Sequence, residues 1–76
     1  EDALEDALKL LDGLCKQTPP YVAAFFRCGQ LLADESRISQ ARSYLRDGIE
    51  AARAAGDMHA AAEMGELLSD LGAEGE

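Results

Sequence analysis

The chain has 76 residues and a mass of 8.1 kDa, enough for one domain that hides only about 60% of the surface its unfolded form exposes. Fifteen acidic residues against seven Lys plus Arg give a formal net charge of -8, so we expect neither nucleic acid nor an anionic membrane as a partner. Hydrophobic residues make up 47% of the chain, and the only prolines are Pro19 and Pro20. This composition predicts an all-α fold of close-packed helices.

The first predicted helix covers residues 3–16. Its apolar residues recur at three- and four-residue steps and are Leu4, Ala7, Leu8, Leu11, Leu14 and Cys15. Ala3 and Leu10 widen the apolar arc to roughly 160° at 100° per residue. One neighbouring helix does not cover so wide an arc, so we expect a second element against this flank.

The second predicted helix covers residues 19–33, with Thr18 as the N-cap and Pro19 at the first helical position. Its inner stripe is Tyr21, Val22, Phe25, Cys28, Gly29 and Leu32. A glycine in a helix costs about 1 kcal/mol relative to alanine. Gly29 therefore predicts a partner helix that approaches closely at this point.

Two further helices are predicted over residues 37–55 and 58–71. The third follows a polar turn, with Ser36 as its cap, and its stripe is Ile38, Ala41, Leu45, Gly48, Ile49 and Ala52. The fourth begins after the stop at Gly56 and the cap at Asp57 and ends at Gly72, for which we expect a left-handed cap. Residues 73–76 are expected to form a frayed tail.

A 34-residue spacing links the first and third predicted helices. It joins Ala7 to Ala41, Leu11 to Leu45 and Leu14 to Gly48. A period of this size is typical of stacked helical hairpins. We therefore expect internal structural repeats.

The segment from Val22 to Gly56 resembles a tetratricopeptide repeat. The resemblance rests on an aromatic residue, a glycine four positions later, and the small and apolar positions that follow, which are Phe25, Gly29, Leu32, Ala41, Leu45 and Gly48. Gly65 echoes Gly29, 36 positions on, but Arg53 replaces the closing proline and Ala61 the next aromatic. The resemblance implies a short right-handed α-solenoid over residues 1–72, with one full repeat between two half repeats.

The same resemblance implies a non-catalytic module that binds a protein or peptide in a groove lined by the second and fourth helices. The candidate contact residues are Phe26, Arg27, Gln30, His59, Glu63 and Glu66. Phe26 is either an anchor for the partner or a second core aromatic. Phe26 and Gln30 stand where some relatives carry the lysine and asparagine of a carboxylate clamp, so that clamp is not carried over. The acidic residues of the fourth helix favour a basic partner or simply form a solvated face.

Self-association is the alternative function. The wide apolar faces of the first and last helices would leave patches that a homo-oligomer buries. The sequence begins with Glu1 rather than Met, so a helix preceding it in a longer chain is another way to cover the first helix.

The sequence does not predict an enzyme, a metal or a cofactor. His59 and Glu63 lie one helical turn apart with no third ligand in the pattern, so we expect a surface histidine. No phosphate loop or zinc motif is present. Cys15 and Cys28 match neither a disulfide framework nor a metal spacing. We expect buried free thiols and a reducing, cytoplasmic location.

Overall fold

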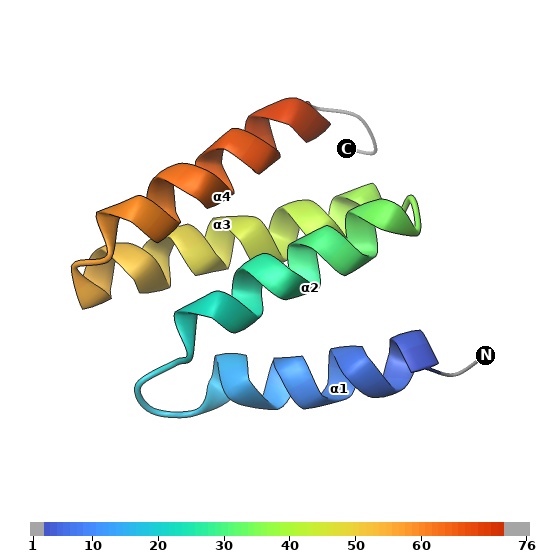
Figure 1. Ribbon diagram of the computed structural model, residues 1–76, viewed down its shortest axis with the longest axis horizontal. Helices are drawn as coiled ribbons and strands as arrows, with labels where there is room; N and C mark the ends of the chain where they lie inside the picture. Colours follow the sequence, from blue (N-terminus) through green and yellow to red (C-terminus); the bar gives the residue numbers. More distant parts are fainter. Residues whose placement is uncertain (1–2, 73–76) are drawn as a thin grey trace.

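The computed structural model describes residues 3–72, and within them the chain forms four α-helices and no strand. The helices are α1 (Ala3–Lys16), α2 (Val22–Asp34), α3 (Ile38–Ala55) and α4 (Met58–Leu71). Successive helices run antiparallel, so that α1 and α3 run in the same direction (Figure 1). The all-α prediction is confirmed, and the predicted tail at 73–76 lies outside the described residues.

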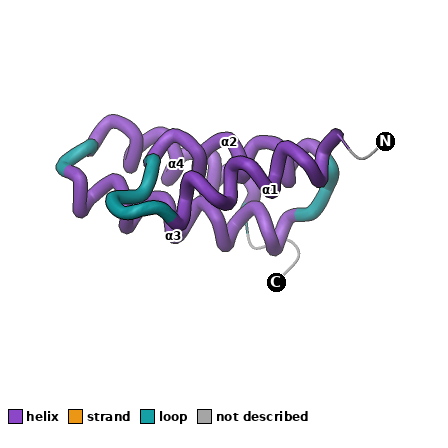
Figure 2. The backbone as a smooth tube through the Cα atoms, turned by 90° about the horizontal axis from the view of Figure 1, so that it is seen from below, coloured by secondary structure: helices purple, strands orange, loops and turns teal. Residues whose placement is uncertain are grey.

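Helix α2 is the central element. It packs against α1 on one side and α3 on the other, and it also touches α4, which packs mainly against α3. Helices α2 and α4 lie in one layer and α3 in the other, while α1 slants across the edge of both layers on the side away from α4 (Figures 1 and 2). Among the described helices, α1 packs closely against α2 alone. Its attachment to α3 depends on side chains.

The core is concentrated on α2 and α3. The buried hydrophobic residues are Cys15, Ala24, Phe25, Cys28, Leu32, Ala41, Leu45, Ala52 and Met64. Cys15 is the only one from α1 and Met64 the only one from α4. The two outer helices are therefore covered on one side only, and Leu10 of α1 is 74% exposed.

Two glycines allow the helices to approach closely. A Cβ atom added to Gly29 would lie 2.6 Å from Leu45 Cδ2, and one added to Gly48 would lie 2.5 Å from Phe25 Cβ and from Met64 Sδ. Neither site has room for a larger residue. Gly65, for which a similar packing role is predicted, differs from them, because a Cβ there meets nothing within 4 Å among the described residues.

The prediction that α2 begins at Pro19 is wrong, since the helix starts at Val22 with Tyr21 as an N-cap that lacks a side-chain hydrogen bond. A proline disfavours helical backbone in the residue before it, and Pro20 acts in this way on Pro19. The Thr18–Pro19 peptide bond is cis, and the Tyr21 N–H donates to the Leu14 carbonyl at 3.0 Å. Tyr21 thus stays in the connection and is exposed rather than in the inner stripe.

The predicted cap at Ser36 is also wrong, because Ser36 closes α2 instead of opening α3. Its φ is 61°, the Arg37 N–H donates to the Leu32 carbonyl at 2.8 Å, and its own N–H donates to Ala33 at 3.0 Å. This pair of bonds is a Schellman motif. The α3 N-cap is Arg37, which makes no side-chain capping bond, so the helix begins at Ile38 rather than at 37.

The end of α3 and the start of α4 follow the prediction. Gly56 is left-handed, with φ 76° and ψ 15°, and a second Schellman motif joins Asp57 N–H to Ala52 and Gly56 N–H to Arg53. The Asp57 carboxylate then accepts the Ala60 N–H at 3.0 Å and caps α4. One glycine and one carboxylate therefore account for this tight connection.

The left-handed cap predicted at Gly72 is not found. Gly72 has φ 65° but ψ -157°, outside the left-handed helical region. The Arg42 guanidinium of α3 instead donates to the carbonyls of Leu68, at 3.3 Å, and Gly72. The Gly72 N–H also donates to the Ser69 carbonyl at 3.0 Å, so a backbone bond and the Arg42 side chain together satisfy carbonyls at the end of α4.

Candidate functional site

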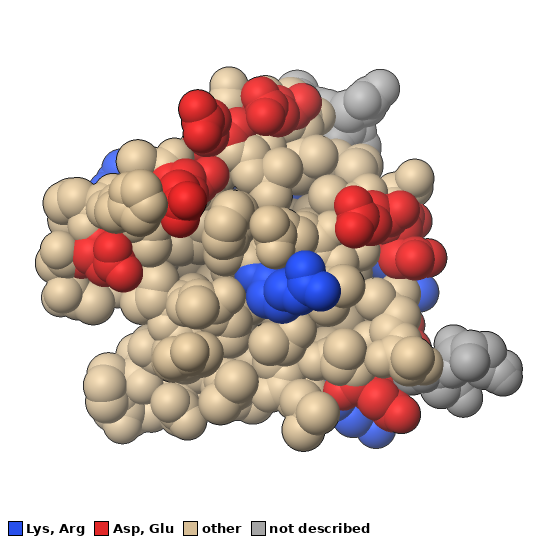
Figure 3. All heavy atoms as spheres, in the orientation of Figure 1, with Lys and Arg blue, Asp and Glu red and all other residues tan. Residues whose placement is uncertain are grey.

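The six predicted contact residues lie on α2 and α4, the two helices that share a layer (Figure 2). Arg27, His59, Glu63 and Glu66 are exposed, whereas Phe26 and Gln30 are partly covered. Acidic side chains gather over α4 when the molecule is viewed from this side (Figure 3). We call this surface the α2–α4 face.

Local pairs order the polar side chains of the α2–α4 face. The Arg27 guanidinium donates to Gln30 Oε1 at 3.4 Å, and His59 Nε2 lies 3.5 Å from a Glu63 carboxylate oxygen. The His59 side chain is 85% exposed. Each pair lies within a single helix and holds its side chains only weakly, since exposed ion pairs contribute about 0–1 kcal/mol. The α2–α4 face is therefore a mainly acidic surface whose polar side chains are only weakly held.

Phe26 does not stand free on this face. Its ring is partly buried and packs against the core cluster that contains its neighbour Phe25. The side chain therefore supports the fold, and only its outer part is open to a partner. Phe26 is therefore partly a core aromatic and partly a surface residue, the two roles that the sequence left open.

A hollow of about 250 Å³ opens on the other side of α2, between α1 and α3. Two carboxylates, two cations, an amide, a phenol and two leucines line it, and they are Glu5, Leu8, Lys9, Asp12, Leu32, Arg37, Gln40 and Tyr44. We call it the α1–α3 slot. Its lining combines an apolar part with several hydrogen-bonding groups, as small-molecule sites do.

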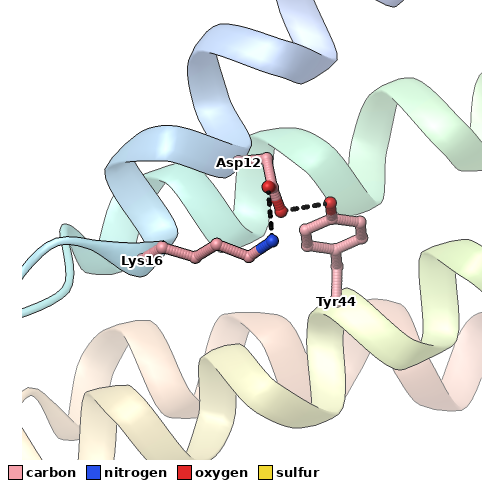
Figure 4. A network of polar contacts seen from close by, with 3 residues as sticks. All are labelled: Asp12, Lys16 and Tyr44. Carbon is pink, nitrogen blue, oxygen red and sulfur yellow. Dashed lines mark hydrogen bonds and ion pairs between the residues drawn. The ribbon is translucent and has the colours of Figure 1, made fainter.

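A polar cluster closes one end of the slot (Figure 4). The Tyr44 hydroxyl of α3 donates to the Asp12 carboxylate of α1 at 2.7 Å, and Lys16 Nζ lies 2.9 Å from the other Asp12 oxygen. The hydrogen bonds from Lys16 and Tyr44 lower the pKa of Asp12 below 3.8. Burial, followed by the bond to Asp12, raises the pKa of Tyr44. Asp12 is therefore a carboxylate and Tyr44 a neutral phenol at neutral pH.

An ion pair closes the other end. Arg37 Nη1 donates to Glu5 Oε2 at 2.9 Å. Glu5 and Asp12 are seven residues apart on α1. Their partners are also seven residues apart, since Arg37 is the N-cap of α3 and Tyr44 lies within it. Each bridge therefore joins residues 32 positions apart in the sequence. Seven residues of helix rise about 10.5 Å. The two bridges thus hold two parallel helices side by side at matched heights.

Sequence reasoning did not find the slot. None of the polar residues that line it is among the predicted site residues. The sequence signal for these contacts is the separation of 32 residues in both bridges, which is close to the 34-residue spacing of the predicted repeat. A search for complementary side chains at that spacing would have paired Glu5 with Arg37 and Asp12 with Tyr44.

The two thiols lie in the core where α1 meets α2. Cys15 and Cys28 are free and buried, as the sequence predicts. Burial raises the pKa of Cys15 to about 12 and also raises that of Cys28, so both sulfurs are protonated at neutral pH. They are poor nucleophiles and pack as small apolar groups.

Comparison of the chain with models of known protein families, with curated proteins and with solved structures finds no match. Within residues 3–72, no helix is long and apolar enough to cross a membrane. The same residues contain no group of three or more His, Cys, Asp and Glu placed to hold a metal ion. The resemblance to tetratricopeptide repeats therefore stays a prediction.

Proposed function

We propose that this chain is a non-catalytic protein-binding module built as a short right-handed α-solenoid of the tetratricopeptide type. In this proposal α2 and α3 form the complete repeat, and α1 and α4 are half repeats. The close approaches at Gly29 and Gly48 support it, because they fall at the small positions through which such hairpins pack. The side-by-side placement of α2 and α4 also supports it (Figure 2).

The α2–α4 face is the surface proposed to bind the partner. The observation that carries this assignment is the exposure of Glu63 and Glu66 on α4, on the same face as exposed Arg27 of α2, in a chain of net charge -8. Such a surface favours a basic or mixed-charge peptide, and its charges speed the encounter more than they tighten the complex. The covered part of Phe26 supplies a rigid apolar edge.

The buried, protonated thiols suit a reducing compartment, so we place the module in the cytoplasm. The proposal assigns it no reaction. Its mechanism is presentation of a preformed surface, without a cofactor.

Selection from a displayed library of random peptides tests the binding proposal. We expect basic peptides to be enriched and their amide NMR shifts to map to α2 and α4. The double variant Glu63→Lys, Glu66→Lys should bind the selected peptides at least about tenfold more weakly, equivalent to 1.4 kcal/mol. The double variant Asp47→Lys, Glu50→Lys on α3 is the control, because it makes the same charge change on two exposed residues of another helix. Equal losses in both variants would show that only net charge matters.

Self-association is the second candidate function. The observation that favours it is Leu10, a large apolar side chain that is 74% exposed on α1, together with Met58 at 57% on α4. Sedimentation equilibrium should then show a dimer that Leu10→Glu dissociates. A chain that stays monomeric at high concentration contradicts this function and leaves the peptide-binding proposal in place.

A further inference from the structure

The α1–α3 slot has matched ends and an open middle. The Arg37–Glu5 ion pair closes one end and the Tyr44–Asp12 hydrogen bond the other, with about two helical turns between them. Leu8 is half-buried and supplies the apolar surface of the slot, whereas Leu32 is fully buried beneath it. The slot is therefore a preformed depression of fixed length rather than a gap that the two helices are free to close.

The polar side chains of the slot divide into those with a protein partner and those without one. Both carboxylates are engaged, Glu5 by Arg37, and Asp12 by Tyr44 and Lys16. Lys9 and Gln40 line the slot, and within the described part of the chain neither makes a hydrogen bond or ion pair. A lysine ammonium offers three N–H donors and accepts nothing. What the slot leaves unpaired is thus chiefly donor capacity and positive charge.

The cations of this chain are scarce, and this region holds a concentration of them. Lys9 and Arg37 line the slot and Lys16 lies beside it, in a protein with only seven Lys plus Arg. The two lining carboxylates balance Lys9 and Arg37, and Lys16 adds one more positive charge. In a molecule of net charge -8, this is a place where an anion meets little local repulsion.

The size of the slot limits what it can hold. At about 250 Å³ it is smaller than the pockets of ~300–1,000 Å³ that enclose drug-sized ligands. The half-buried Leu8 favours a short apolar body, and Lys9 with Gln40 favours an acceptor head group. A small organic anion with one apolar end satisfies both requirements.

We propose that the α1–α3 slot binds a small monocarboxylate, with its carboxylate on Lys9 and Gln40 and its hydrocarbon part on the half-buried Leu8. This site lies on the opposite side of α2 from the α2–α4 face and does not depend on the proposed function. Because α1 packs closely against α2 alone, a molecule held between α1 and α3 also strengthens the attachment of α1.

Titration with hexanoate, followed by NMR, tests the proposal. We expect saturable shifts at Leu8, Lys9, Leu32 and Gln40, with a Kd on the order of 1 mM for so small a ligand. Hexanamide has the same shape without the charge and should bind at least about fivefold more weakly, since charged hydrogen bonds are roughly twice as strong as neutral ones.

Lys9→Gln should lower hexanoate binding to the level of hexanamide. Lys9 is exposed and has no partner within the described residues, so the variant should fold normally. Arg53→Gln makes the same charge change on an exposed residue of α3 away from the slot and should bind hexanoate like the parent chain. The proposal is overturned by shifts that fall outside the slot residues, by equal binding of the two probes, or by hexanoate binding that Lys9→Gln leaves unchanged.

Discussion

The Tyr44 hydroxyl of α3 donates a 2.7 Å hydrogen bond to the Asp12 carboxylate of α1, 32 residues away in the chain. This contact joins two helices that do not otherwise pack closely against each other. Lys16 holds the second oxygen of the same carboxylate at 2.9 Å, so Asp12 accepts from two sides. The direct contacts between α1 and α3 thus include this carboxylate and the Arg37–Glu5 pair, while α2 packs between the two helices and sets their distance.

Tyr44→Phe should lower the free energy of unfolding by about 1 kcal/mol, a value reduced from the ~1.5–3 kcal/mol of charged hydrogen bonds because the site is partly exposed. It should also raise the pKa of Asp12, since one of the two donors is lost. Urea unfolding and carboxyl NMR measure the two effects. Tyr21→Phe is the matched control, because Tyr21 is exposed and its hydroxyl makes no hydrogen bond within the described residues. If both variants unfold alike, the contact contributes nothing.

Acid should weaken the fold through the same carboxylate. The bonds from Lys16 and Tyr44 lower the pKa of Asp12 in the folded state below the ordinary 3.8. Its contribution to stability is thus fully present above pH 3.8 and is lost as the pH falls through the lower, folded pKa. Asp12→Asn should be less stable than the parent chain at pH 7, and the gap between them should narrow below pH 3.8. A gap that is constant with pH would contradict the assignment.

The interiors of the helices and the α3–α4 connection could be predicted from the sequence, whereas the α1–α2 and α2–α3 connections could not. The apolar spacing and the Asp57 cap place α1 and α4 at their observed bounds, because side chains three and four apart share a helix face. Ser36 failed as a cap because its left-handed backbone is set by the closing bonds of α2, which involve Leu32 and Ala33. Such a conformation is not encoded by the identity of the serine alone.

The contacts across the slot were out of reach for a related reason. Asp12 and Tyr44 meet only because α2 sets the distance and height between α1 and α3, and that distance follows from packing around residues such as Leu32. The apolar periodicity of a helix predicts the face on which each residue lies, but not the residue of another helix that it contacts. The α2–α4 face was easier to predict, because exposure follows directly from the helical period.

The four helical glycines should respond to alanine in opposite ways. Gly48→Ala should cost about 1–3 kcal/mol, the range for overpacked cores, because the added methyl meets Phe25 Cβ, which is fixed to the backbone. Gly29→Ala should cost less, since the added methyl meets Cδ2 and Cγ of the Leu45 side chain rather than an atom fixed to the backbone. Gly13→Ala and Gly65→Ala meet nothing within 4 Å and should stabilise the chain by about 0.5–1 kcal/mol. Thermal unfolding of the four variants gives the order directly, and a stabilising Gly48→Ala would contradict the packing of α3 on α2.

The two Schellman motifs provide another matched pair. Ser36 and Gly56 occupy the same place after α2 and α3, with φ of 61° and 76°. Left-handed backbone costs a residue with a side chain about 1–2 kcal/mol. Glycine avoids this cost, but part of the gain is offset because glycine loses more conformational entropy on folding. Ser36→Gly should therefore raise the stability by up to about 1 kcal/mol, and Gly56→Ala should lower it by about 1 kcal/mol. Changes of the same sign in both variants would mean that the backbone conformation of one connection differs from that described.

Phe26 offers a way to separate support of the fold from contact with a partner. Removal of a fully buried phenylalanine costs about 3–5 kcal/mol, and the half-buried ring of Phe26 should therefore cost about 2 kcal/mol in Phe26→Ala. Phe26→Leu keeps an apolar side chain of similar reach against the core and should restore most of that stability while removing the aromatic edge from the α2–α4 face. Urea unfolding measures the first effect, and binding of the selected basic peptides measures the second. If the leucine variant is as stable as the parent chain and binds peptide equally well, the ring serves the core alone and the partner is held by the charged residues of the face.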